Sequence, residues 1–206
     1  MKKMMFNDRY GLTQAVIHGR KTVTRRIVDP QGKYEELRWW QPCLEFEECM
    51  YGYTENGGWE VIEPRYNVGE IVAVAQCYMD LGYSGTALDR DPKDIMNVRG
   101  TLKQSAGWNN KMFVRAEACK HQIQITDIRI ERLQDISEED CMKEGIYRDY
   151  ADTEFPPREF YDYDGNNGNG FNTPRAAFAS LINKVSGRGT WDRNPFVWRI
   201  EFELVK

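Results

Sequence analysis

Regular alternation of apolar and polar residues marks the end of the chain as a strand with one buried face. The apolar positions there are Phe196, Trp198, Ile200, Phe202 and Leu204. A period of two places successive side chains on opposite faces of a sheet. We therefore expect a strand over residues 196–204 with its apolar face against the core.

Two internal segments also have the pattern of core strands. Residues 68–78 form a nearly continuous apolar run after a glycine-centred turn, which is typical of a strand buried on both faces. Between residues 122 and 133 the apolar alternation slips by one residue at Thr126 and Asp127, and a β-bulge explains that slip. A further short strand is expected at residues 112–114.

Three segments have helical spacing together with helix-terminating signals. Asn7 or Asp8 can cap a first helix over residues 9–18, and a glycine follows it where positive φ is favoured. A capping serine precedes three acids at the start of a second helix over residues 138–144. The third helix is expected from residue 173 to about residue 185.

Three stretches lack a regular pattern, and we expect insertions near residues 31–66, 79–108 and 147–172. The first contains an Asn-Gly-Gly run, which favours a hairpin or an irregular segment. Residues 150–173 have the Asn and Gly content of a mobile loop with little to pack, and a lid is one interpretation. Because strands outnumber helices without alternating regularly with them, the expected architecture is one α+β domain over residues 1–206, a small mixed barrel.

Composition favours a folded cytoplasmic protein. The chain has 206 residues, of which 41% are hydrophobic and 29% are charged, and this balance can bury a core. No apolar window approaches the length of a membrane span, and the N-terminus becomes polar too soon for a signal peptide. Five cysteines without a CxxC pair and only two histidines argue for reduced thiols and against a structural metal.

The charges are segregated along the chain, although the net charge is only −4. Residues 1–26 contain seven lysines and arginines and a single acid, whereas residues 127–164 contain thirteen acids and five bases. An anionic partner is therefore expected to bind the N-terminal end and to be repelled by the acidic segment.

Four stretches carry a resemblance to a known family. They are HGRKTVTRR (18–26), VGEIVAVAQCY (68–78), ITDIRIERLQDISEEDCMKEGI (125–146) and WDRNPFVWRIEFELV (191–205). The first resembles a Gly-x-Lys-x-x-Thr-x-Arg signature, and the ordered set is similar to the ASCH family of the PUA-like superfamily, in its larger phage and prophage form.

The resemblance implies a closed β-barrel of five or six strands, with helices at its ends and a cleft beside the first helix. Members of the superfamily bind RNA or modified bases, and some small ASCH proteins hydrolyse the amide of N4-acetylcytidine with a Lys, a Thr and a Glu. The matching positions in this sequence are Lys21, Thr24 and Glu144. The resemblance therefore implies a catalytic set that needs no cofactor.

Five further residues are candidates for substrate contacts. The larger family form often has a Glu where this chain has Gln76, which alters the charge available to a ligand. Cations of the basic loop suit phosphate oxygens, and a tryptophan in an insertion can stack on a base. The candidates are Arg20, Arg25, Arg26, Gln76 and Trp108.

Each proposed catalytic residue also has an alternative interpretation. Lys21 suits either phosphate binding or, if desolvated, proton abstraction. Thr24 is also an ordinary strand former, and in a regular strand residues 21 and 24 point to opposite faces, so catalysis requires a bend between them. Glu144 in the last turn of a helix opposes the helix dipole, which marks either a functional acid or a tolerated exposed one.

The first hypothesis is a protein that binds a cytidine-like nucleoside and hydrolyses an N4-acyl amide. The second is a non-catalytic module that binds single-stranded RNA or a modified nucleotide in the same cleft. A ribonuclease that uses this cleft is the third.

Overall fold

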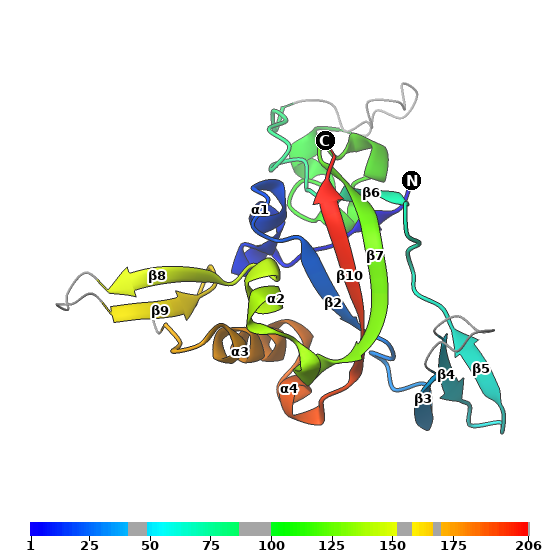
Figure 1. The fold of residues 1–206 in the computed structure, drawn as a ribbon. Helices are drawn as coiled ribbons and strands as arrows, with labels where there is room; N and C mark the ends of the chain where they lie inside the picture. The colour runs from blue at the N-terminus through cyan, green and yellow to red at the C-terminus, as the bar shows by residue number, and fades with distance from the viewer. Residues whose placement is uncertain (41–48, 87–99, 152–157, 167–169, 206) are drawn as a thin grey trace.

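The computed structural model describes residues 1–40, 49–86, 100–151, 158–166 and 170–205, and its largest element is a five-stranded sheet (Figure 1). The sheet has the order β1-β6-β7-β10-β2. Its first pair, β1 with β6, is parallel, and the other three pairs are antiparallel. The strands are β1 (Lys3–Met4), β2 (Val23–Ile27), β6 (Ile71–Val74), β7 (Gln122–Arg132) and β10 (Phe196–Leu204).

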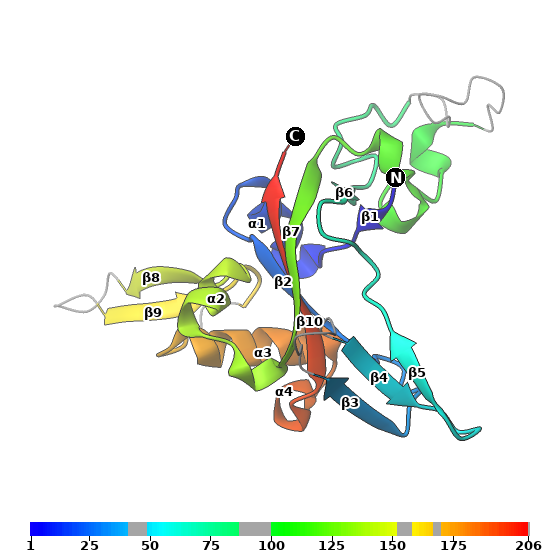
Figure 2. The same ribbon diagram turned by 45° about the vertical axis from the view of Figure 1, so that its right-hand side comes forward.

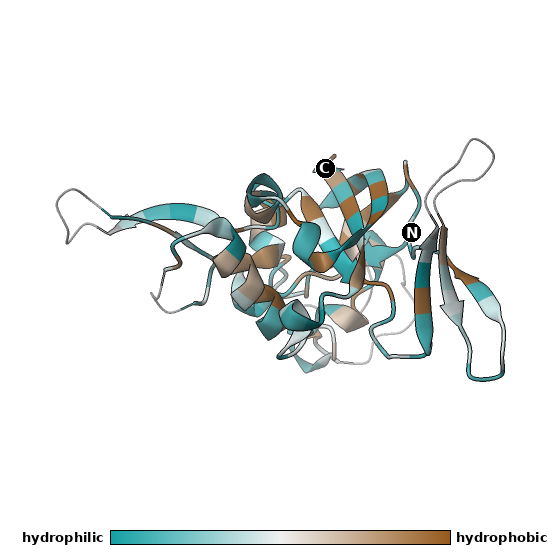
Figure 3. Ribbon diagram, turned by 60° about the horizontal axis from the view of Figure 1, so that its bottom comes forward, coloured by the Kyte–Doolittle hydropathy of each residue, from teal (hydrophilic) through white to brown (hydrophobic). Residues whose placement is uncertain are grey.

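The long strands β7 and β10 form the centre of this sheet. Their pairing shifts register between Glu201 and Phe202, which pair with Asp127 and Ile125, so Thr126 is the extra residue of a bulge. This confirms the bulge that the slipped alternation predicts. Figure 3 shows the alternating hydrophobic and hydrophilic bands along the sheet strands that result from the period of two.

Helices pack against this sheet and enclose the main core. They are α1 (Leu12–Ile17), α2 (Glu138–Lys143), α3 (Pro174–Ser186) and α4 (Thr190–Arg193). The predicted helices over residues 138–144 and 173–185 are confirmed. The first helix is shorter than predicted because Gly11, with φ of 62°, separates α1 from the 3-10 turn η1 (Asp8–Tyr10), which Asn7 caps.

The pairings among the described strands form an open series from β1 to β2 rather than a ring. The fold is therefore a mixed α+β structure built on an open sheet, and these pairings do not include the closure that a barrel requires. The two ends of the series nevertheless approach each other. The Arg26 side chain in β2 donates a hydrogen bond of 2.5 Å to the carbonyl of Met5, directly after β1.

The segment expected to form an insertion at residues 31–66 contains a separate three-stranded antiparallel sheet. Its strands are β3 (Glu36–Trp40), β4 (Cys49–Tyr53) and β5 (Trp59–Ile62). The Asn-Gly-Gly run lies in the turn between β4 and β5, which confirms the hairpin. Met50 and Ile62 from this sheet pack with Ile130 and Phe196 of the main sheet. In Figures 1 and 2 the small sheet and the β8–β9 hairpin lie on opposite sides of the main sheet.

Two strand predictions need correction. Residues 112–114 do not form a strand, because Asn110 caps the 3-10 helix η3 (Lys111–Phe113) by accepting a hydrogen bond from the amide of Met112. The run at residues 68–78 contributes only the four residues of β6, and the first of these is exposed. The remaining 3-10 helices are η2 (Leu102–Gln104), η4 (Ala116–Ala118) and η5 (Leu133–Asp135).

The segment expected to be a mobile loop with little to pack contains a hairpin and a core residue. Strands β8 (Tyr147–Ala151) and β9 (Arg158–Asp162) pair, while residues 152–157 and 167–169 lie outside the described residues. Tyr163 is fully buried, stacks on Phe171 and shares a hydrogen bond of 2.9 Å with Ser180. The expectation of little packing is therefore wrong for the described part of this segment.

Replacing Tyr163 by alanine should lower the free energy of unfolding by about 3–5 kcal/mol, because a buried aromatic ring is lost from the main core. Urea denaturation measures this change. The matched control is Tyr150→Ala in the preceding β8–β9 hairpin, where the side chain is half exposed and the change should stay within about 0.5 kcal/mol. Equal effects of the two substitutions would contradict the assignment of Tyr163 to the core.

Candidate functional site

A cavity of about 600 Å³ lies beside the first helix, between the N-terminal segment, strands β2 and β10, and helix α3. Five of the residues selected from sequence border it. They are Lys21, Thr24, Arg25, Arg26 and Glu144. Apolar and aromatic side chains form much of the remaining wall. They include Phe6, Leu12, Tyr66, Phe178, Trp198 and Ile200.

The basic loop reaches this cavity because it is anchored at both ends. Gly19, with φ of 71°, follows α1, and the amide of Lys21 donates a hydrogen bond to the carbonyl of Ala15. The amide of Thr22 bonds the last residue of α2 at 2.9 Å. Strand β2 begins only at Val23, so Lys21 precedes the regular strand. Both Lys21 and Thr24 border the cavity, although a regular strand would direct residues 21 and 24 to opposite faces.

Lys21 is a buried cation whose three protons all have acceptors. Its side chain is 2% exposed. The ammonium donates to the carbonyls of Val23 at 2.8 Å and Glu144 at 2.9 Å, and to Oε2 of Glu144. Burial lowers the pKa of Lys21, the Glu144 carboxylate opposes this shift, and the neighbouring cations Arg26 and Arg25 add to it.

Glu144 lies at the C-terminal end of α2, where its charge opposes the helix dipole. The next residue, Gly145, has φ of 102°, which allows the chain to leave the helix there. The Lys21 ammonium binds both the carboxylate and the terminal carbonyl of Glu144. One cation thus compensates both the carboxylate and the negative end of the helix.

Thr24 presents a hydroxyl group at the same cavity. It pairs across the sheet with Ile200, which also lines the cavity, and cross-strand partners share a face of the sheet. Among the described residues, no hydrogen-bond partner of the Thr24 hydroxyl is found. The hydroxyl is therefore available to a ligand.

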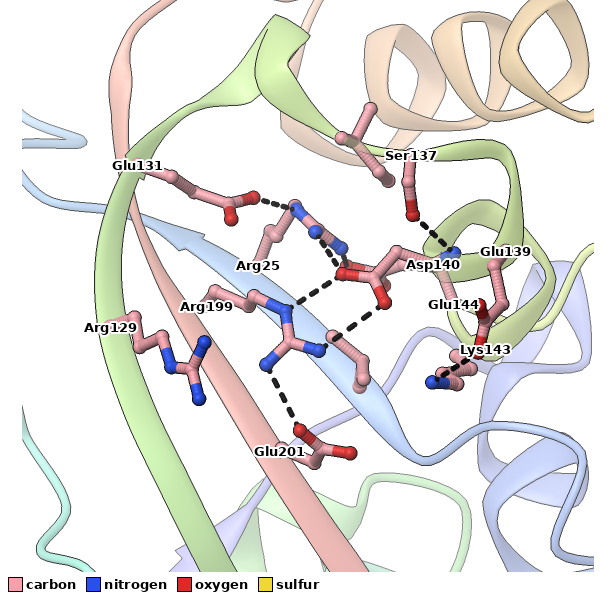
Figure 4. A network of polar contacts seen from close by, with 12 residues as sticks. Arg25, Arg129, Glu131, Ser137, Glu139, Asp140, Lys143, Glu144, Arg199 and Glu201 are labelled. Atoms are coloured by element: carbon pink, nitrogen blue, oxygen red, sulfur yellow. Dashed lines mark hydrogen bonds and ion pairs between the residues drawn. The ribbon is translucent and has the colours of Figure 1, made fainter.

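Arg25 borders the cavity, but its guanidinium group is fully engaged by carboxylates (Figure 4). Its Nε donates to Glu131 at 2.5 Å, its Nη2 to Asp140 at 2.6 Å and its Nη1 to Oε1 of Glu144 at 3.2 Å. Asp140 also accepts from Arg199 at 2.7 Å. Sequence reasoning missed Glu131, Asp140 and Arg199. The one signal for Asp140 is its spacing of four residues from Glu144 on one helix.

Of the other substrate-contact candidates, only Arg26 lines the cavity. Arg26 lines the cavity, where its guanidinium lies 5.7 Å from the ring of Phe6. Arg20 does not border the cavity and forms an ion pair of 3.3 Å with Asp164. Gln76 and Trp108 also lie elsewhere.

Gln76 and Trp108 lie after β6 and are not among the residues that line the cavity. Gln76 is buried, and its side-chain oxygen has no hydrogen-bond partner among the described residues. Trp108 packs against the small cluster that contains Tyr78 and Leu81, and it borders a shallow depression of its own. The structure does not bring either side chain to the cavity of Lys21 and Glu144.

The basic and acidic segments of the sequence meet in the fold instead of acting separately. Each of Arg20, Lys21 and Arg25 forms an ion pair with an acid from residues 127–164. The chain itself therefore supplies counter-charges to three of the four cations of the basic loop, and the binding of an anionic partner at this end stays a prediction.

Thiol and metal chemistry have no support in the described residues. Burial raises the pKa of Cys141, beside Asp140, to about 12, and burial also raises the pKa of Cys77 and of Cys119. No group of three His, Cys, Asp or Glu side chains suited to a metal ion occurs in the part of the chain that the structure describes.

No helix within the described ranges is long and apolar enough to cross a membrane.

Comparison with known proteins adds no relative to this description. No protein-family model matches the sequence, and neither a curated protein nor a solved structure matches it.

Stability should depend on the ionisation of Asp140 below pH 4. Burial alone would raise its pKa, but hydrogen bonds from Arg199 and Arg25 lower the pKa to about 2. Because the folded pKa lies below the unfolded value, the stabilisation is complete above pH 4 and is lost as the pH falls through about 2. The stability difference between wild type and Asp140→Asn should therefore shrink by roughly 2 kcal/mol between pH 5 and pH 2.

Urea denaturation at a series of pH values measures that difference. The control is Glu138→Gln in the same helix, where the side chain is exposed. If the difference in free energy of unfolding between wild type and Asp140→Asn stays constant down to pH 2, the two arginines do not stabilise the Asp140 carboxylate.

Proposed function

We propose that this chain is an ASCH-type protein that binds a cytidine-like nucleoside in the cavity and hydrolyses an N4-acyl amide. One observation carries the proposal. Lys21 and Thr24, three residues apart, border one cavity together with Glu144 from a distant part of the chain, and Lys21 contacts Glu144 there. The resemblance selects the same three residues without any knowledge of the fold. The approach of β1 and β2 supports the proposal that the sheet belongs to a PUA-like barrel.

The reaction would begin at the Thr24 hydroxyl. A hydroxyl needs a neighbouring base to attack an amide carbon, and a lysine whose pKa is lowered by burial can supply one. Transfer of a proton from Lys21 to Glu144, across their existing contact, leaves a neutral amine and a carboxylic acid. The amine then accepts the Thr24 proton as the oxygen bonds to the acyl carbon.

The acid formed on Glu144 completes the first half of the reaction. It donates its proton to N4 of the cytosine as the carbon–nitrogen bond breaks, so cytidine leaves as the free amine. The acyl group remains as an ester on Thr24, and Lys21 and Glu144 are again a charged pair. Water then hydrolyses the ester, which releases the carboxylic acid and restores the hydroxyl.

The cavity wall suits a nucleoside. Its volume lies within the range of small-molecule sites, which are mostly apolar with a few directed polar groups. The ring of Trp198 borders the cavity and offers an aromatic surface on which a base can stack. Arg26 supplies guanidinium donors for the pyrimidine carbonyl or for the ribose hydroxyls.

The ion pairs of the basic loop favour a nucleoside over a polynucleotide. Binding to a nucleic-acid backbone depends on cations that neutralise phosphates. Arg25 is committed to three carboxylates, and Arg20 is paired with Asp164. The loop therefore offers fewer cations to RNA than its sequence suggests.

Removing the Thr24 hydroxyl should abolish hydrolysis. Thr24→Val keeps the shape of the side chain and lacks the nucleophile, so the rate of cytidine release from N4-acetylcytidine should fall by about a thousandfold or more. Mass spectrometry of the products measures this rate across a panel of N4-acylated cytidines. Thr22→Val, two residues earlier and outside the cavity lining, is the matched control and should retain the wild-type rate.

Two results would contradict the assignment. Full activity of Thr24→Val would remove Thr24 from the role of nucleophile. A wild-type protein that hydrolyses no acylated cytidine but binds cytidine nucleosides, more weakly after Thr24→Val, would identify the cavity as a recognition site. Lys21→Met and Glu144→Gln are less direct probes, because each leaves a buried partner unpaired and should destabilise the fold by about 3–5 kcal/mol.

A further inference from the structure

Three arginines lie side by side across the centre of the main sheet. Arg199 in β10 is the direct cross-strand partner of Arg25 in β2 and of Arg129 in β7. Cross-strand partners share one face, so like charges would repel there without intervening acids. Carboxylates from α2 and from the strands lie among the guanidinium groups (Figure 4). They are those of Asp127, Glu131, Asp140, Glu144 and Glu201.

Helix α2 contributes two of these acids at a spacing of four residues. Residues four apart lie on the same side of a helix, where like charges repel. Arg25 contacts both, through Nη2 to Asp140 at 2.6 Å and Nη1 to Glu144 at 3.2 Å. A single guanidinium thus bridges the start and the end of α2.

Asp140 is in turn held in place by Arg199. Nε of Arg199 donates to Oδ2 of Asp140 at 2.7 Å, and Nη2 donates to Oδ1 at 3.2 Å. A two-point contact of this kind fixes orientation as well as distance. With a pKa of about 2, Asp140 keeps its charge at neutral pH.

The two carboxylate oxygens of Glu144 have different partners. Oε1 accepts from Arg25, and Oε2 accepts from Lys21 at the cavity. Strand alternation directs Arg25 and Thr24 to opposite faces of β2. Glu144 therefore contacts both Lys21 at the cavity and Arg25 of the arginine cluster.

We propose that Arg25 is a positioning residue, anchored by Asp140 and Arg199, which holds Glu144 so that Oε2 meets Lys21. The inference rests on the function proposed above, because it assigns Arg25 a part in that same site. It also replaces the role that the sequence suggests for Arg25, since no guanidinium nitrogen is left without a carboxylate partner. A lysine in this position would keep the charge but lose the planar, three-way geometry.

The test compares Arg25→Lys and Asp140→Asn with Arg129→Gln. The third variant is the matched control, because Arg129 belongs to the same row but is exposed and contacts Asp127 rather than Glu144. With N4-acetylcytidine, the first two variants should lower kcat by about tenfold to a hundredfold with KM within twofold, since a small displacement of a proton-transferring group slows the chemical step. Arg129→Gln should leave both constants unchanged.

A second readout does not need catalysis. The ammonium protons of Lys21, held by three acceptors, should exchange slowly with water in ¹H–¹⁵N spectra of the wild type. Their exchange should become at least tenfold faster in both test variants and not in Arg129→Gln, because Glu144 is no longer held against the amine. If Arg25→Lys does not fold, Asp140→Asn alone provides the comparison.

The outcomes separate the two proposals. Folded test variants with wild-type exchange at Lys21 would overturn the positioning role and leave Arg25 as a structural ion pair. A wild type without amide hydrolysis would overturn the proposed function, while faster exchange in the variants would still support the positioning of Glu144 by Arg25.

Discussion

The buried contact between Lys21 and Glu144 is the constraint on which the arrangement of the site depends. Two charges removed from water need each other and further hydrogen bonds, or the fold loses several kcal/mol. Lys21 meets this requirement with three acceptors, two of them on Glu144. Since Lys21 follows α1 and Glu144 ends α2, their contact fixes the loop before β2 against the end of that helix. The same contact brings an amine, a carboxylate and the Thr24 hydroxyl to one cavity.

The sheet separates two environments that Glu144 connects. The cavity face carries Thr24 and apolar rings, and there burial lowers the pKa of Lys21. The other face carries the row of arginines and the carboxylates that form ion pairs with them. Burial of Lys21 beside this ion-pair network suits proton transfer, because burial lowers the pKa of the base while the ion pairs hold the acid in place. The three residues that the sequence resemblance selects all border this cavity.

Local sequence patterns predicted the strands and helices that depend on residues close to one another in the sequence. The period of two gave the last strand, the slipped alternation gave the bulge at Thr126, and the capping serine gave α2. The predictions failed where a local cap or a distant contact overrides composition. Asn110 turns the short apolar run after it into a 3-10 helix. Tyr163 lies in a segment rich in Asn and Gly, yet it is buried by Phe171 and α3, which sequence periodicity does not reveal.

For the candidate site, the sequence by itself determined the chemical groups and the order in which they occur: a basic loop after a helix, a threonine three residues beyond Lys21, and an acid at the end of a short helix. Only the tertiary structure decided which of these groups remain available. It pairs Arg25 with three acids that lie more than a hundred residues away, leaves the Thr24 hydroxyl open to the cavity, and places Gln76 and Trp108 elsewhere. The physical reason is that ion pairing and burial depend on contacts between distant segments. Spacing along a chain specifies the face of a strand or helix, but not the partner that covers it.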